Sequence, residues 1–168
     1  MILICYDGSE DAKAAIKHLG QLLPGAPATV LTVWDPFTKF SAGGRSRICP
    51  LATIVDPDEA NEKLHADAQE LAGEGVELAN IAGLKAEPAA IEQHGSVADA
   101  IVRAAEELDA DPIVLGSRGA GGIASVLLGS VSHNVLQRAD RMVLVIPSPQ
   151  VAARRHKALQ HEAEAATA

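Results

Sequence analysis

Four short stretches of this chain are almost entirely apolar, and each ends at a turn-forming residue. They are residues 1–6, 28–34, 112–115 and 142–146. Strands that are apolar on both faces are typical of a parallel sheet covered by helices on each side. Helical patterns separate these runs. The sequence therefore predicts an α/β fold built on a doubly wound parallel sheet.

The remaining elements follow from local signals between these runs. A further strand is expected over 84–92, and Pro88 places it at the sheet's edge. Helices are expected over 9–23, 58–82 and 96–108, with Ser9 and Ser96 as N-caps. Asp99, three residues after Ser96, completes a capping box. Apolar side chains of the third helix are expected to face inward, at Val97, Ile101, Ala104, Ala105 and Leu108. A strand over 76–81 is the competing interpretation of the second helix's end.

Composition narrows the class of protein and of partner. The chain has 168 residues, 48% of them hydrophobic, which suits one globular domain with a sizeable core. Its 14 Lys and Arg against 22 Asp and Glu give a net charge of −8, which disfavours nucleic acid or an anionic membrane as partner. Two cysteines, Cys5 and Cys49, indicate no disulfide framework. No apolar run is long enough for a signal h-region or a membrane span, so a cytoplasmic protein is expected.

The strand at 112–115 runs directly into a glycine-rich loop. Gly116-Ser117-Arg118-Gly119 is followed, nine residues later, by Gly129-Ser130-Val131. Glycines at 116, 119, 121 and 122 would let several N–H groups point one way, and they tolerate positive φ. The pattern becomes helical from Ala124, so Ser130 and Val131 are expected near a helix's amino end.

Such a loop is suited to an anion. Unpaired N–H groups and the positive end of the helix dipole favour phosphate. The Ser130 hydroxyl adds a donor, and the Arg118 guanidinium can bind two phosphate oxygens at once. Alternatively, glycine and serine serve only tight packing and capping at this turn.

The spacing Gly-x2-Gly-x9-Gly-Ser resembles the nucleotide loop of the universal stress protein family, in its ATP-binding branch. The resemblance extends over about residues 1–147, since residues 2–9 resemble that family's first strand with its acidic turn and residues 142–147 its last strand. It implies an adenine nucleotide alpha hydrolase-like fold, with a five-stranded sheet in the order 3-2-1-4-5. Residues 148–168 would form a tail, either an exposed helix or disordered.

The resemblance also implies a nucleotide site and a dimer. Asp7 ends the first strand, at the edge where open α/β sheets bind ligands, although Asp7 could also simply cap its turn. Val33 would offer main-chain groups to adenine, and Cys5 stands where relatives often have proline. Mg²⁺ would be carried by the phosphates of ATP, and the 142–146 edge strand would pair with its copy in a homodimer. The implied nucleotide-binding residues are Cys5, Asp7, Val33, Leu115, Gly116, Arg118, Gly119, Gly129, Ser130 and Val131.

Other interpretations fit less well. The P-loop pattern is absent, and Gly119-x-Gly121-x-x-Ala124 lacks the acid about twenty residues downstream that a dinucleotide site requires. A slow ATPase or nucleotidyl transferase would depend on His133 and Asp7, which carry no recognisable motif. A structural dimer with an empty loop is the third alternative. His94 has no metal-ligand spacing around it, and Arg45 and Arg47 could reach phosphate from a long loop at 37–56 or simply be solvated.

Overall fold

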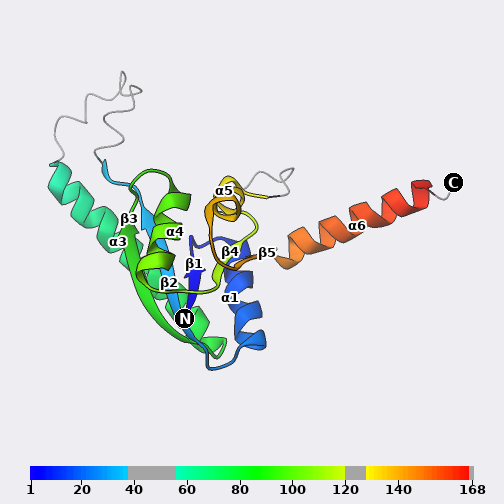
Figure 1. Ribbon diagram of the computed structural model, residues 1–168, viewed down its shortest axis with the longest axis horizontal. Coiled ribbons are helices and arrows are strands. Elements are labelled where there is room, and N and C mark those ends of the chain that lie inside the picture. The colour runs from blue at the N-terminus through cyan, green and yellow to red at the C-terminus, as the bar shows by residue number, and fades with distance from the viewer. Residues whose placement is uncertain (38–55, 120–127, 167–168) are drawn as a thin grey trace, which may run out of the picture.

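All five strands run parallel, in the order β3-β2-β1-β4-β5 (Figure 1). The computed structural model describes residues 1–37, 56–119 and 128–166. The strands are β1 (Ile2–Cys5), β2 (Pro27–Trp34), β3 (Lys85–Glu92), β4 (Ile113–Gly116) and β5 (Val143–Ile146). The helices are α1 (Glu10–Leu22), α3 (Pro57–Ile81), α4 (Val97–Glu107), α5 (Ser130–Arg138) and α6 (Pro149–Ala166). The predicted fold and strand order are confirmed, and residues 76–81 are helical.

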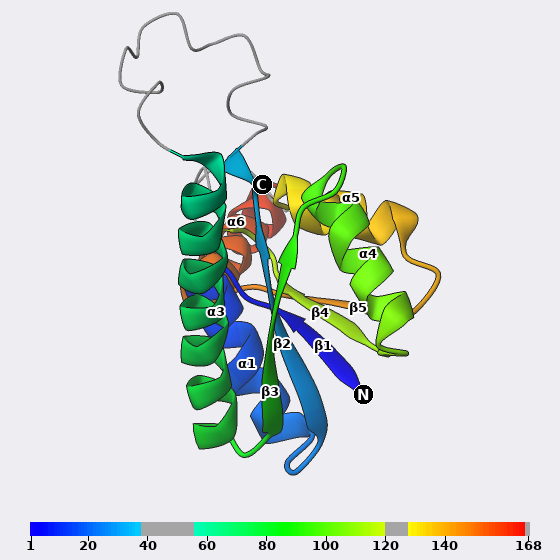
Figure 2. The same cartoon turned by 90° about the vertical axis from the view of Figure 1, so that its left-hand side faces the viewer.

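Helices cover both faces of the sheet, with α1 and α3 on one side and α4 and α5 on the other (Figure 2). Strand β1 shows why its sequence is apolar throughout. Ile4 belongs to the core beneath α1 and α3, whereas Leu3 belongs to the core beneath α4 and α5. Both side chains are fully buried. The outer strands are β3, which contains Pro88 as predicted for an edge, and β5.

The two predicted serine caps are present. Ser9 Oγ accepts a hydrogen bond from Ala12 N at 3.2 Å at the start of α1. Ser96 and Asp99 form the reciprocal capping box at the start of α4, with hydrogen bonds of 3.1 and 3.2 Å. Leu108 was expected to face inward, and this is wrong. It is the C-cap residue of α4 and 38% exposed, because the helix ends one residue before it.

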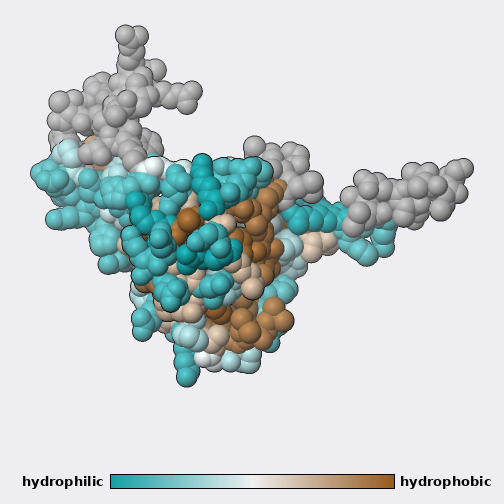
Figure 3. Space-filling view, viewed as in Figure 1, coloured by the Kyte–Doolittle hydropathy of each residue, from teal (hydrophilic) through white to brown (hydrophobic). Residues whose placement is uncertain are grey.

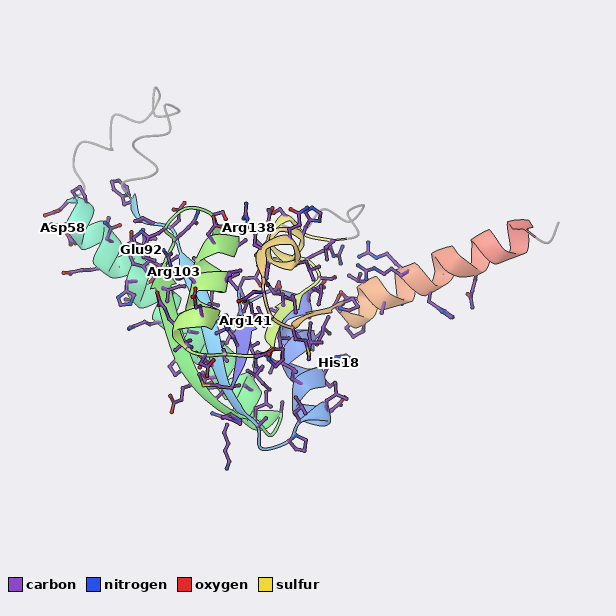
Figure 4. The ribbon with its side chains drawn as sticks, viewed as in Figure 1. His18, Asp58, Glu92, Arg103, Arg138 and Arg141 are labelled. Carbon is purple, nitrogen blue, oxygen red and sulfur yellow. The ribbon has the colours of Figure 1, made fainter. Side chains whose placement is uncertain are left out.

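Two arginines tie α4 to the segment around α5 (Figure 4). Arg138, in the last turn of α5, donates to Ser96 Oγ at 3.0 Å and lies 3.4 Å from Asp99 Oδ1. Arg141 donates to the carbonyl oxygens of Ala105 and Ala110, at 2.8 and 3.1 Å. The carboxyl end of α4 is thereby fixed against the approach to β5.

Helix α5 begins later than its sequence pattern predicts. A helix from Ala124 was expected, but Leu128 is not helical and Gly129 is an extended N-cap with φ −66° and ψ 156°. Residues 120–127, with Gly121 and Gly122, lie outside the described residues. Apolar periodicity crosses Gly129 unbroken, so it could not mark this boundary. Ser130 is nevertheless the first residue of the helix and Val131 the second, as expected.

The tail forms helix α6, which projects from the body (Figure 1). Val151, in its first turn, is buried, whereas Ala152, Ala153 and Arg154 are exposed. Of the helices in the three described ranges, none has the length and apolarity to span a bilayer.

Candidate functional site

A cavity of about 170 Å³ opens at the carboxyl ends of β1, β2 and β4. Its inner wall is apolar, with Leu31, Val97 and Ile101 among its residues. Most of the predicted binding residues line it: Cys5, Asp7, Val33, Leu115, Gly116, Arg118, Gly119 and Val131. Gly129 and Ser130 are not among the lining residues. They come at the carboxyl-terminal end of the glycine-rich segment, where Gly129 N donates a hydrogen bond to Ser117 O at 2.8 Å.

Asp7 lies at the mouth of this cavity, directly after β1. Its Oδ1 accepts a hydrogen bond from Ser9 N at 3.1 Å, so it does cap its turn. Gly8 makes the turn possible, because its φ of +75° is a conformation that side-chain-bearing residues rarely adopt. Although Asp7 caps this turn, it remains exposed and lines the cavity. The two interpretations of Asp7 are therefore compatible.

Gly116 serves close packing rather than loop curvature. Gly116 and Gly119 are not among the glycines with positive φ, so that expectation is wrong for these two. A β-carbon on Gly116 would lie 2.8 Å from Ala12 N and from the backbone carbon of Asp11. The first turn of α1 thus passes directly against the end of β4, and the packing interpretation holds at this position.

The loop offers fewer free amides than the glycine content suggested. Ser117 N donates to Ile146 O at 2.9 Å, and Arg118 N donates to Asp11 Oδ2 at 3.1 Å. Among the described residues of the loop, the N–H groups left to face a ligand are those around Gly119 and at the amino end of α5. That helix has no side-chain cap and no acid in its first turn. Its first N–H groups are therefore suited to an anion.

Two contacts hold the amino end of α5 against the loop. A β-carbon on Gly129 would stand 3.3 Å from Arg118 Cα and 3.4 Å from Ser117 O, so glycine permits the close approach. Ser132, one turn into the helix, donates from Oγ to Gly116 O at 2.8 Å. The loop and the helix terminus are positioned as one unit.

The sequence pattern around Asp11 indicates only an acid in the first turn of a helix and does not predict its contacts with the glycine loop. It is 4% exposed, and its Oδ2 accepts a hydrogen bond of 2.6 Å from Ser117 Oγ as well as the one from Arg118 N. Arg118 Nε lies 3.8 Å from the same oxygen. Burial alone would raise the pKa of Asp11, but hydrogen bonding from Ser117, the approach of the buried Ser148 hydroxyl and the charge of Arg118 outweigh it and lower the pKa.

Arg118 has capacity left for a ligand. Its side chain is 13% exposed and lines the cavity. Nε is buried, and no atom of the described residues accepts a hydrogen bond from it. A guanidinium in this state favours an additional anionic oxygen.

Cys5 and Tyr6 form the floor of the cavity at the end of β1. Burial, and secondarily the charge of Asp7, raises the pKa of the Cys5 thiol. Tyr6 donates from its hydroxyl to Glu74 Oε1 at 2.7 Å, and Thr32 Oγ1 donates to Tyr6 O at 3.1 Å. These bonds fix the end of β1 to α3 and to β2.

No metal-binding cluster of His, Cys, Asp or Glu occurs among the described residues. His133 lies on α5 and is exposed, and the exposed His94 is 3.7 Å from the half-buried Glu92. Arg45, Arg47 and Cys49 fall outside the described ranges. No histidine is among the described residues that line the cavity.

The fold and the cavity define a class of protein. In doubly wound sheets, ligands bind where the strand order reverses, outside the carboxyl ends of the strands. Here that point is between β1 and β4, where Asp7 and the glycine loop meet. The chain is thus an open α/β protein with a cavity at its switch point, the place where such proteins bind ligands.

The family follows from comparison with known proteins. The universal stress protein family matches residues 1–147, and the chain belongs to that family. It is 32% identical over 149 residues to a universal stress protein of Thermus aquaticus, covering 86% of this chain and 96% of that one. It is 30% identical over 153 residues to universal stress protein MJ0531 of Methanocaldococcus jannaschii, covering 89% and 82% of the two chains.

Solved structures show the same architecture. The structure of protein MJ0577 superposes with a TM-score of 0.68 at 27% identity, over 87% of this chain and 94% of that one. A universal stress protein determined in complex with cAMP gives a TM-score of 0.57 at 25% identity, over 88% and 95%. The predicted membership in the universal stress protein family is confirmed.

Proposed function

We propose that this chain is a cytoplasmic nucleotide-dependent regulator that binds ATP in the switch-point cavity. The observation that carries the proposal is the union of three features around one cavity: an apolar wall, the Asp7 carboxylate at its mouth, and the loop with Arg118 beside the open amino end of α5. An adenine nucleotide needs an apolar slot, an acceptor for its ribose hydroxyls and donors for its phosphates. The universal stress protein solved with cAMP supports a purine nucleotide.

The nucleoside would lie against the cavity wall. Leu31, Ile101 and Leu115 would supply apolar surface for the base. Val33, which also lines the cavity, would offer its main chain to the adenine edge. Asp7 would accept hydrogen bonds from the ribose. Cys5, where relatives often have proline, is the wall residue that departs from the pattern.

The phosphates would lie along the loop. Arg118 provides charge and the unsatisfied Nε, Gly119 keeps the surface open, and Ser130 and Val131 provide helix N–H groups. The residues present therefore fit a polyphosphate. Mg²⁺, held mainly by that polyphosphate, would neutralise part of its charge.

Equilibrium dialysis of the full chain tests this proposal. ATP, ADP, AMP and cyclic AMP would be compared with and without Mg²⁺, and released phosphate would be measured in parallel. We expect ATP with Mg²⁺ to bind without turnover, and Gly119→Val to abolish the binding while the thermal unfolding midpoint is kept. Absence of binding at millimolar nucleotide would refute the proposal and favour a structural dimer. Multiple turnovers would instead favour an ATPase.

We also propose that β5 pairs with its copy in a homodimer. The strand is at the sheet's edge, and Met142 beside it is 60% exposed. Figure 3 shows apolar surface over the region of α5 and β5. Met142 O and Ile146 O accept hydrogen bonds from Ile113 and Ser117. Because strand residues alternate, the backbone groups of Val143 and Val145 face the free edge.

That alternation supplies a sharp test. Val145→Pro removes an N–H from the free edge and none from the pairing with β4. Light scattering after size-exclusion chromatography should show a dimer for the parent chain and a monomer for the variant. Ile81→Gln, exposed at the end of α3 and near the β3 edge of the sheet, is the control and should remain dimeric. A dimer unaffected by Val145→Pro would place the interface elsewhere.

A further inference from the structure

Asp11 joins two segments that the chain separates by more than a hundred residues. It lies in the first turn of α1, and its Oδ2 meets three atoms of the glycine loop: Ser117 Oγ at 2.6 Å, Arg118 N at 3.1 Å and Arg118 Nε at 3.8 Å. Asp11 is not among the residues that line the cavity. A group in this position can act on a ligand only through the loop.

The three contacts control the features of the loop that matter to an anion. The Arg118 amide is held inward by Asp11, and this fixes the peptide between Ser117 and Arg118, one residue before Gly119. The guanidinium is attracted to Asp11, yet Nε makes no hydrogen bond to it, because 3.8 Å is too long. The charge of Arg118 is thereby oriented while the donor remains unused.

The residues around Asp11 restrict the position of its carboxylate. Gly116 brings the backbone of Asp11 against the end of β4, since a β-carbon there would lie 2.8 Å from Asp11 Cβ. Asp11 is 4% exposed, so water does not compete for its oxygens. Ser148, between β5 and α6, is also buried.

We propose that Asp11 is a positioning residue: it holds the Arg118 guanidinium, and the backbone that carries it, in the orientation in which the guanidinium meets the nucleotide phosphates. The inference rests on the proposed ATP site and deepens it. Asp11 would then set the preference for ATP over adenosine without affecting recognition of the base. A carboxylate that only stabilised the fold would affect both ligands alike.

Calorimetric titration of the full chain with ATP and with adenosine tests this. In Asp11→Asn, which keeps the side-chain size, we expect ATP affinity to fall by roughly tenfold and adenosine affinity to change less than twofold. Ser117→Ala, which retains the charge and removes one hydrogen bond, should cause a smaller loss of the same kind. Asp99→Asn is the matched control: that acid also lies in a first helical turn and pairs with an arginine, 3.4 Å away, but outside the cavity. It should change neither affinity.

A second measurement does not depend on nucleotide. Hydrogen exchange at the Arg118 amide of the ligand-free protein should be faster in Asp11→Asn and unchanged in Asp99→Asn. An equal loss of ATP and adenosine affinity, tighter ATP binding, or unchanged exchange would overturn the inference. Should Asp11→Asn fail to fold, an unchanged ratio of ATP to adenosine affinity in Ser117→Ala would overturn it. If the parent chain bound neither ATP nor adenosine, the proposed ATP site would be refuted, and the inference about Asp11 with it. A loss of affinity seen only in the variants is a different result, because the parent chain would still bind.

Discussion

Gly119 and Asp7 approach each other so closely that a β-carbon on Gly119 would stand 2.7 Å from Oδ2 of Asp7. Real β-carbons do not come that near an oxygen. The atom in the way belongs to the end of a short side chain, which can rotate. Substitution at Gly119 should therefore displace the carboxylate and leave the backbone in place.

We accordingly expect Gly119→Ala to separate binding from folding. Its urea unfolding midpoint should match the parent's, whereas its affinity for adenosine should fall about tenfold, roughly the loss of one hydrogen bond to a charged group. Titration calorimetry measures the affinity. Gly73→Ala, within α3 and with open space around the added carbon, is the control and should raise stability by about 1 kcal/mol without changing binding. Unaltered adenosine binding in Gly119→Ala would remove Asp7 from the site.

Substitution of Gly116, unlike that of Gly119, should destabilise the fold. A β-carbon there meets backbone atoms of α1 at 2.8 Å, and backbone cannot rotate aside. Gly116→Ala is expected to lower the free energy of unfolding by roughly 1–3 kcal/mol, the range for overpacking in a dense interior. Urea denaturation followed by circular dichroism measures this against the parent chain and Gly73→Ala. A variant as stable as the parent would show that α1 can move away from β4.

The elements that the sequence predicted correctly depend on neighbouring residues. Strands β1, β2 and β4 are continuous apolar runs, and the capping box of α4 needs only Ser96 and Asp99. Such patterns are complete within a few positions of the chain. They can be recognised without knowledge of the tertiary structure.

The features that escaped prediction depend on contacts between distant segments. The hydrogen bond from Ser117 to Asp11 spans 106 residues, and nothing near Asp11 indicates it. Glycine is equally ambiguous, because the same letter serves positive φ at Gly8 and close packing at Gly116. The glycine spacing was enough to locate the candidate site. The individual role of each residue in it could be assigned only from the three-dimensional structure.

The buried Asp11 carboxylate should make part of the stability dependent on pH. Its pKa in the folded chain lies below the ordinary value of 3.8, so its contribution is complete above that value and is lost as the pH falls through the folded-state pKa. Asp11→Asn should therefore lower the free energy of unfolding by about 1–3 kcal/mol near neutral pH. The difference between the two proteins should shrink below about pH 4. Urea titrations at several pH values measure it; a difference that stays constant into acid would show that Asp11 is not ionised in the folded chain.

Cys5 offers a chemical probe of the cavity. Burial and the Asp7 charge raise its pKa, so at mildly alkaline pH very little of it is thiolate, the form that reacts with iodoacetamide. In a Cys49→Ser chain, where Cys5 is the one remaining cysteine, alkylation should be at least about tenfold slower in the folded protein than in urea. ATP should slow it further, because Cys5 lies on the cavity wall. Mass spectrometry measures the labelled fraction, with Cys5→Ser as the control for reaction at Cys49. Labelling as fast in the folded chain as in urea would mean that the cavity floor is open to water, and an apolar slot for adenine could not lie there.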